Sequence, residues 1–290
     1  MKKRPAEGLF SFLDMERRLA TLRAEMSAPE RNKFTAPLLL LHGLWSGGWV
    51  WHKLAGALSQ RGWECWALDL RGRPGSKTVE KIGQIQLEDY SEDVLMAAQH
   101  LWASPIICGH DLGALLALLT AAQVQPRALI CLAPLLPQTW VADGRPPAPL
   151  VRLSAVPALL WGHALHPPRL AMARDFFFNT FPSAAQSQLH ARLQADSGAV
   201  ARKLTHGYVS CSAAGVPCPV LVVSGGADRM SPPATVRWLV ERLSAEHHDY
   251  PGQGHWLLAG EQWMRIASDL HRWLIRTLGE SLLVPQESEE

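Results

Sequence analysis

The sequence lacks the long apolar runs and the excess of one charge that would set it apart from ordinary globular proteins. None of its apolar stretches approaches the roughly 20 residues needed to cross a bilayer, so no membrane span is expected. The 28 Lys and Arg residues nearly balance 26 Asp and Glu residues, giving a net charge of +2 without a long basic run. Because phosphate backbones are bound by clustered positive charge, no nucleic-acid partner is expected.

Cysteine is scarce and shows no pairing pattern. The five cysteines are an odd number, and Cys211 and Cys218 are too far apart for a metal-binding CxxC motif. We therefore expect reduced thiols in a cytoplasmic protein. Glu7, Asp14 and Glu16 interrupt the continuous apolar segment that a signal peptide would need after the basic start of the chain.

The apolar residues that are present follow a clear pattern. They make up 48% of the 290 residues, against 19% charged residues, which is ample for a large core. From Pro37 onward, short apolar runs alternate with longer amphipathic stretches, which predicts an α/β fold with a mainly parallel sheet of about six strands and helices on both faces. The strands are expected at 37–42, 63–69, 105–109, 127–133, 219–224 and 246–250. The helices are expected at 48–61, 87–103, 112–123, 232–244 and 261–278.

Three segments fall outside this alternation. Residues 134–212 contain 9 of the 21 prolines and no strand pattern, which predicts a helical cap inserted over the ligand-binding edge of a core formed by residues 37–133 and 213–280. Residues 281–290 form an acidic tail. Residues 1–36 have apolar side chains at helical spacing and are predicted to form an N-terminal helical extension, which docks on the body or, alternatively, binds a partner or a membrane surface. Those apolar residues are Leu9, Phe12, Leu13, Leu19, Leu22 and Met26.

The most informative motif is Gly-His-Asp-Leu-Gly at 109–113, between a buried strand and an apolar helix. A sharp bend from strand to helix strains the residue at its apex and needs small neighbours, which Gly109 and Gly113 supply. Asp111 at the apex would then project into the ligand crevice. The simpler interpretation is an acidic cap on the helix.

Two further residues support the catalytic interpretation. Asp228 follows the fifth expected strand and His255 the sixth, so both open at the same sheet edge as Asp111. Nucleophile, acid and histidine thus occur in the order of an α/β-hydrolase triad. With His-Gly-Leu-Trp at 42–45, the chain resembles the α/β-hydrolase superfamily over residues 37–278. The resemblance implies an oxyanion hole formed by the backbone N–H groups of Leu44 and Leu112.

An aspartate at the apex changes the expected chemistry, because a carboxylate is already ionised near neutral pH and can displace a leaving group from saturated carbon. Asp111 would form an alkyl–enzyme ester, which water activated by His255 would hydrolyse, with Asp228 orienting the imidazole. The motif is similar to the epoxide hydrolase and haloalkane dehalogenase branch, which implies a small apolar organic substrate with an epoxide or carbon–halogen bond, and neither cofactor nor metal. The alternatives are an ester or lactone hydrolase on the same triad and a ligand-binding homologue without turnover.

The sequence departs from that branch where the leaving group would be held. Epoxide hydrolases of this type use two cap tyrosines, but Tyr208 is the single tyrosine in or next to the expected cap, with histidines as substitutes. Leu112 stands where dehalogenases often have a tryptophan, and Trp45 stands where proline is common. The candidate pocket residues are Trp45, His110, Trp140, Trp161, Tyr208 and Trp256. The substitute histidines are His163, His166, His190 and His206.

Overall fold

A central sheet of eight strands organises the chain, and the computed structural model describes residues 15–140, 148–206, 209 and 215–283. In sheet order the strands are β1 Met15–Leu19, β2 Leu22–Ser27, β4 Cys65–Leu68, β3 Leu38–Leu41, β5 Ile106–His110, β6 Leu129–Leu132, β9 Val220–Gly225 and β10 Glu246–Tyr250. The strands from β4 to β10 in this order are parallel, as predicted. Their carboxyl ends therefore meet at one edge of the sheet.

The N-terminal helix predicted from the sequence is wrong for residues 15–27, which form the antiparallel hairpin β1–β2. β2 pairs antiparallel with β4 and extends the sheet at that side. Leu22 and Ala24 are buried while Arg23 and Glu25 are less so, which is the alternation of a half-buried strand and not the spacing of a helix. Residues 1–14 of the predicted helix lie outside the described residues.

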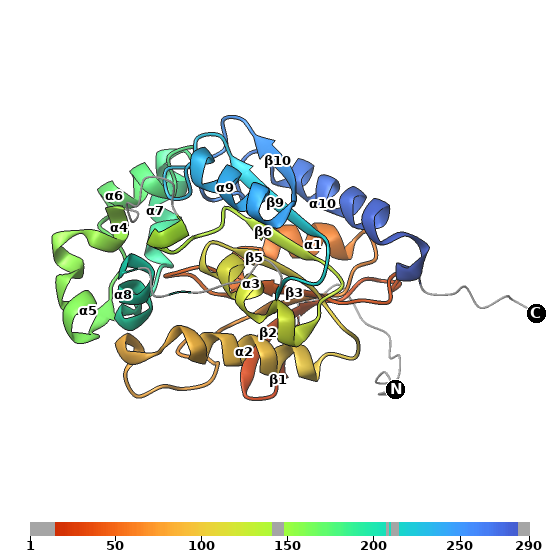
Figure 1. The fold of residues 1–290 in the computed structure, drawn as a ribbon, viewed down its shortest axis with the longest axis horizontal. Coiled ribbons are helices and arrows are strands. Elements are labelled where there is room, and N and C mark those ends of the chain that lie inside the picture. Colours follow the sequence, from red (N-terminus) through yellow and green to blue (C-terminus); the bar gives the residue numbers. More distant parts are fainter. Residues whose placement is uncertain (1–14, 141–147, 207–208, 210–214, 284–290) are drawn as a thin grey trace, which may run out of the picture.

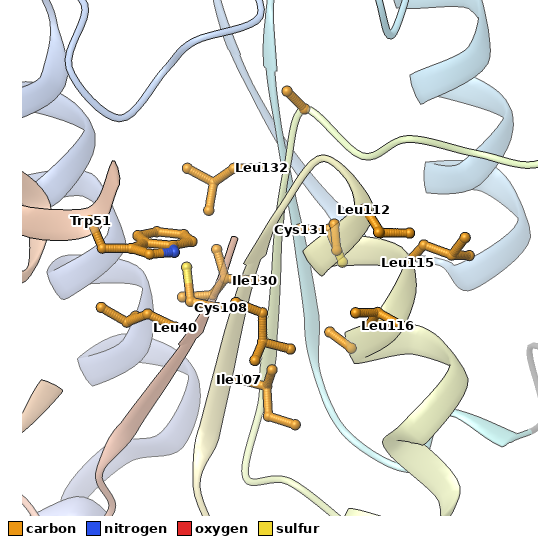
Figure 2. Packing of buried hydrophobic residues seen from close by; sticks show 14 of the residues in the cluster. Leu40, Trp51, Ile107, Cys108, Leu112, Leu115, Leu116, Ile130, Cys131 and Leu132 are labelled. Atoms are coloured by element: carbon orange, nitrogen blue, oxygen red, sulfur yellow. The ribbon is translucent and has the colours of Figure 1, made fainter. Parts of the chain in front are cut away.

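Helices lie on both faces of the sheet, and all but one of the five core helices pack in two pairs (Figure 1). The core helices are α1 His52–Ser59, α2 Leu87–His100, α3 Leu112–Val124, α9 Pro233–Leu243 and α10 Trp263–Leu278, with the short helices η1 Gly48–Trp51, η2 Ile82–Gln84 and η6 Gly279–Leu282. α1 packs on α10, and α2 packs on α3. Figure 2 shows Trp51 and Cys108 on one side of the strands, with Leu115, Leu116 and Cys131 on the other. Both faces of the sheet are thus buried.

The segment between β6 and β9 supplies the helices gathered at one end of the molecule, green to teal in Figure 1. Its elements are η3 Gln138–Trp140, α4 Ala148–Val151, η4 Leu153–Ala155, α5 Val156–Trp161, β7 Ala164–Leu165, α6 Leu170–Phe176, α7 Ser183–Ala191, β8 Asp196–Ser197 and α8 Gly198–His206. β7 and β8 form a short antiparallel pair that the sequence did not predict. We call residues 148–206 the cap segment.

Among the described residues, no helix combines the length and apolar character that spanning a bilayer demands. Within the same part of the chain, the four cysteines are free thiols, and Cys65, Cys108 and Cys131 are buried. Cys211 lies outside the described residues.

Candidate active site

The bend between β5 and α3 holds Asp111 in a strained backbone conformation. Its φ of 54° and ψ of −120° lie in a region that side-chain-bearing residues rarely adopt. The bend closes because its neighbours lack side chains: a Cβ on Gly109 would lie 2.3 Å from the Gly113 backbone, and one on Gly113 would lie 2.2 Å from the Leu41 carbonyl oxygen. The two glycines therefore permit the close packing that turns the chain at Asp111.

The two carboxylate oxygens of Asp111 have different surroundings. Oδ2 accepts a hydrogen bond of 2.7 Å from the Leu44 N–H, and Oδ1 lies 3.6 Å from Nε2 of His255. That separation is too long for a hydrogen bond. Within the described residues, neither Asp111 Oδ1 nor His255 Nε2 has a hydrogen-bond partner, although both are buried. Buried polar atoms are seldom unpaired, so this gap is a place where a reacting atom could bind.

Asp228 fixes the imidazole of His255 from the opposite side. Its Oδ2 accepts a hydrogen bond of 3.0 Å from Nδ1 of His255. Its Oδ1 accepts backbone N–H groups of Met230 at 2.7 Å and Ser231 at 3.0 Å, which hold the carboxylate in place. The acid thus directs Nε2 of His255 toward Asp111, the arrangement expected of a nucleophile, base and acid.

The charges around His255 favour its protonated form. Burial by itself disfavours the charged imidazolium, but the carboxylates of Asp228 and Asp111 outweigh it and raise the pKa of His255 to about 10. In the resting site at neutral pH, His255 is therefore an imidazolium cation between two carboxylates. Removing the charge of either carboxylate would lower this pKa.

The two oxyanion residues predicted from the sequence adjoin Asp111. The Leu44 N–H donates to Asp111 Oδ2, and Leu112, buried, is the first residue of α3. N–H groups in the first turn of a helix have no acceptor within that helix. Leu44 thus reaches the carboxylate from the loop after β3, and Leu112 follows Asp111 directly in the chain.

Two of the pocket candidates lie beside the triad but use their polar atoms elsewhere. Trp45 donates its indole N–H to the Leu165 carbonyl oxygen at 2.9 Å, so this group is not free to hold a leaving group. His110 donates from Nε2 to the His255 carbonyl oxygen at 2.9 Å, and burial lowers the pKa of His110 to about 4. A neutral His110 therefore supports the backbone of His255.

The other pocket candidates differ in how far their side chains are buried. Trp256 is buried, with its ring centre 5.9 Å from that of His110. Trp140 packs on Trp238 with 5.9 Å between ring centres, and the Trp161 side chain is 64% exposed. Tyr208 lies outside the described residues. His163, His166 and His206 are exposed, and His190 directs Nε2 to the Pro168 carbonyl oxygen at 2.8 Å.

Sequence reasoning missed the aromatic and polar residues that the cap segment brings to the site. The Phe177 ring packs against the rings of both Trp45 and His255, with centres 5.6 Å and 5.7 Å away. Asn179 donates from Nδ2 to the Ala227 carbonyl oxygen, next to Asp228, at 2.8 Å. The run of three phenylalanines at 176–178 is the single signal that could have indicated an apolar wall here.

The donor set offers nothing for a metal among the residues that the structure describes: no three His, Cys, Asp or Glu side chains cluster so that they could hold an ion. The chemistry available from the described side chains is that of two carboxylates, one imidazole and the backbone N–H groups beside them.

Comparison with known proteins places this geometry in a family. The Alpha/beta hydrolase family matches residues 38–268. Similar solved structures include a monoacylglycerol lipase from Paleococcus ferrophilus, 19% identical with a TM-score of 0.67, covering 88% of this chain and 99% of that chain. A thermophilic esterase from Thermogutta terrifontis is 20% identical with a TM-score of 0.65, covering 88% and 94%. An N-acyl homoserine lactonase is 18% identical with a TM-score of 0.65, covering 94% and 98%.

These structural likenesses concern the fold, because all three identities are below 25%. No curated protein matches the sequence significantly. The family match covers most of the chain, including the loops that carry Asp111, Asp228 and His255. The chain therefore belongs to the alpha/beta hydrolase family.

Proposed function

We propose that the protein is a cofactor-independent hydrolase in which Asp111 is the nucleophile, His255 the general base and Asp228 the acid that orients His255. The observation that carries the proposal is the division of the Asp111 carboxylate: Oδ2 is bound to the Leu44 N–H, and Oδ1 faces His255 without a hydrogen-bond partner among the described residues. One oxygen is thereby fixed and the other is available for attack.

In the first step, Oδ1 of Asp111 attacks a saturated carbon of the substrate. A carbon–oxygen bond forms to Asp111 as the bond to the leaving group breaks. The electron pair departs with the leaving halide or stays on the opened epoxide oxygen, which takes a proton from water. The product is an alkyl ester of Asp111. The Asp111 carboxylate attacks without the help of a base, so His255 can remain protonated opposite it during this step.

In the second step, water attacks the ester carbon of Asp111 and His255 accepts the proton of that water. Esterification has removed the negative charge of Asp111, which lowers the pKa of His255, so that the imidazolium releases the proton on Nε2 to solvent before it acts as a base. Negative charge then develops on Oδ2, where the Leu44 N–H already donates. Collapse of the intermediate breaks the bond to the alkyl oxygen, releases the alcohol or diol and regenerates the carboxylate.

The leaving group needs a donor, and the tyrosines of the described residues are already engaged. Tyr90 donates its hydroxyl to Asp196 and Tyr250 to Asp269. The indole N–H groups of Trp49 and Trp256 are buried and have no acceptor among the described residues, and the two rings lie 5.8 Å apart. Free indole donors support a leaving halide better than an epoxide oxygen, which needs an acid.

The second candidate function is hydrolysis of an ester or lactone on the same triad. It is favoured by the similar solved structures, whose names include a lipase, an esterase and a lactonase. In that case Asp111 would attack the substrate carbonyl or act as a base toward water. A third reading, a ligand-binding protein without turnover, would leave the same pocket without a chemical step.

The test is a trapping experiment with His255→Gln. We expect this variant to complete the first step but not the second, so that incubation with small haloalkanes or epoxides leaves a mass adduct on the peptide that contains Asp111. His100→Gln is the matched control, because His100 is an exposed histidine at the end of α2. This control should turn over without retaining an adduct.

The outcomes separate the candidates. Halide release or diol formation by the unmodified protein identifies the leaving group. Ester or lactone turnover with no adduct from any alkylating substrate supports the second candidate. Tight binding without turnover supports the third, and adducts at other residues with activity retained in Asp111→Ala would show that Asp111 is not the nucleophile.

A further inference from the structure

The backbone beside the oxyanion donor is held by the cap segment. Trp45, directly after Leu44, has a φ of 59°, another conformation that side-chain-bearing residues rarely adopt. Its N–H donates to Oδ2 of Asp196 at 2.8 Å, and its carbonyl oxygen accepts the Gln194 N–H at 2.8 Å. The Trp45 indole donates to the Leu165 carbonyl oxygen. Three residues of the cap segment thus bind one residue of the core.

Asp196 is the charged member of this junction, and it is fully buried. Each of its oxygens accepts two hydrogen bonds: Oδ2 from Trp45 and from the Arg73 guanidinium, Oδ1 from the Tyr90 hydroxyl at 2.8 Å and from the Ser197 N–H at 2.7 Å. Arg73 is buried as well and also donates to the Ala195 carbonyl oxygen at 2.8 Å. The carboxylate is therefore fixed in position and direction.

A buried ion pair is an expensive way to join two parts of a chain, because both charges lose their hydration. Packing alone would not require it. What the charge provides at this place is a short, directional acceptor for a backbone N–H that would otherwise be buried unpaired. The proline common in the family at this position has no N–H, whereas Trp45 has one that points at Asp196.

We propose that Asp196 is a positioning residue of the catalytic centre, which holds the peptide between Leu44 and Trp45 so that the Leu44 N–H points at Oδ2 of Asp111. The inference rests on the proposed function, in which Oδ2 becomes the oxyanion. Asp196 contacts neither substrate nor reacting atoms. It acts through Trp45, one residue from the donor.

The two chemical steps depend on this donor in opposite ways. In the first step negative charge leaves Asp111, so the hydrogen bond from Leu44 weakens toward the transition state and does not speed attack. In the second step negative charge builds on Oδ2, and the same hydrogen bond strengthens. Loss of its alignment should therefore slow ester hydrolysis and leave ester formation nearly unchanged.

The experiment compares two double variants that differ in one acceptor. Arg73→Gln with Asp196→Asn removes both charges but keeps an amide oxygen for the Trp45 N–H. Arg73→Gln with Asp196→Leu removes the charges and the acceptor at nearly the same side-chain shape. Single turnovers are followed by intact mass, which gives the rates at which the Asp111 ester forms and decays.

The asparagine variant should hydrolyse the ester within about threefold of the unmodified rate. The leucine variant should hydrolyse it about tenfold more slowly or worse, accumulating ester at an unchanged rate of formation, because small misplacements of an oxyanion donor have large effects on rate. Tyr90→Phe is a further control, since it removes a hydrogen bond from Oδ1 of Asp196 without touching Trp45. It should not slow ester decay.

Equal decay rates in the two double variants, or formation and decay slowed alike, would overturn the inference. If the leucine variant does not fold, Arg73→Gln with Asp196→Ser replaces it, because the shorter hydroxyl side chain does not reach the Trp45 N–H. Failure of the proposed function has a different signature: no ester on Asp111 forms in His255→Gln either. If the ester forms in His255→Gln, but decays at equal rates in all the Asp196 variants that retain His255, the positioning role alone is refuted.

Discussion

Asp111 and Asp196 are two buried carboxylates with opposite surroundings. Both oxygens of Asp196 are saturated by hydrogen bonds from an arginine, a tyrosine and two backbone N–H groups. Asp111 has a single such bond, on Oδ2, and its other oxygen faces His255 unpaired. Burial alone does not distinguish them, since both side chains are almost inaccessible.

This difference in hydrogen bonding separates a carboxylate with a structural role from one with a chemical role. A fully paired buried carboxylate holds structure together, and its removal leaves charged and polar partners without a counterpart. A buried carboxylate with an unpaired oxygen costs stability and is kept for what it can react with. The two aspartates should therefore respond to substitution in opposite ways.

The largest expected effect is on activity at Asp111. Asp111→Asn should lower kcat for the preferred substrate by about 10⁴-fold or more, as removal of a nucleophile does in other enzymes, because an amide cannot displace the leaving group. Its free energy of unfolding should fall by less than that of Asp196→Ala, since asparagine tolerates a positive φ and keeps an acceptor for the Leu44 N–H, so that the loss is limited to the charge facing His255. Steady-state kinetics and urea denaturation measure the two quantities. Retained activity in this variant would show that Asp111 is not the nucleophile.

The next effect is on stability at Asp196. Asp196→Ala should lower the free energy of unfolding by about 3–5 kcal/mol, because Arg73 is then left buried with an unbalanced charge. Tyr90→Phe should cost only about 1 kcal/mol, the contribution of one hydrogen bond. Urea denaturation at neutral pH checks both values. A cost below 1 kcal/mol for Asp196→Ala would mean that the junction does not hold the cap segment to the core.

The core could be predicted from the sequence because its information is local. All six predicted strands occur within a few residues of their expected bounds, since each is a short apolar run that the sheet buries on both faces. The motif at 109–113 marks Asp111 as the apex of a bend, because Gly109 and Gly113 are the two small residues that the close packing there needs. Strand order then brings Asp228 and His255 to the same edge.

The N-terminal hairpin could not be predicted in this way. Its two-residue turn is Ala20-Thr21, with Ala20 at a φ of 57°, and it lacks the Asn-Gly or Asp-Gly pair that indicates such turns. Leu19, Leu22 and Met26 also fit helical spacing. The strand is favoured over the helix because β2 pairs with β4 at the side of the sheet, and this pairing exists only in the folded chain.

The contacts of the cap segment escape prediction because they join distant residues. Arg73 and Asp196 are 123 positions apart, and no pattern in the sequence links the two. Trp45 and Trp161 carry the same indole, yet one is buried with its N–H bonded and the other is exposed on the surface. Residue type alone does not tell which aromatic side chains reach the site.

The smallest expected effect is a pH dependence of stability that differs in sign between the two regions. The pKa of His255 is raised from 6.5 to about 10 in the folded protein, so its stabilising contribution is complete below about pH 6.5 and is lost as the pH rises toward 10. Burial opposes ionisation of Asp196, yet Arg73 and the hydrogen bonds lower its pKa below 3.8, so its contribution is lost only as the pH falls below that value. The difference in unfolding free energy between the unmodified protein and His255→Gln should therefore shrink by about 1 kcal/mol or more between pH 6.5 and 10, since one pKa unit corresponds to about 1.4 kcal/mol. Urea denaturation across this range measures it. A constant difference would show that the carboxylates of Asp111 and Asp228 do not share a proton-bearing imidazole in the resting site.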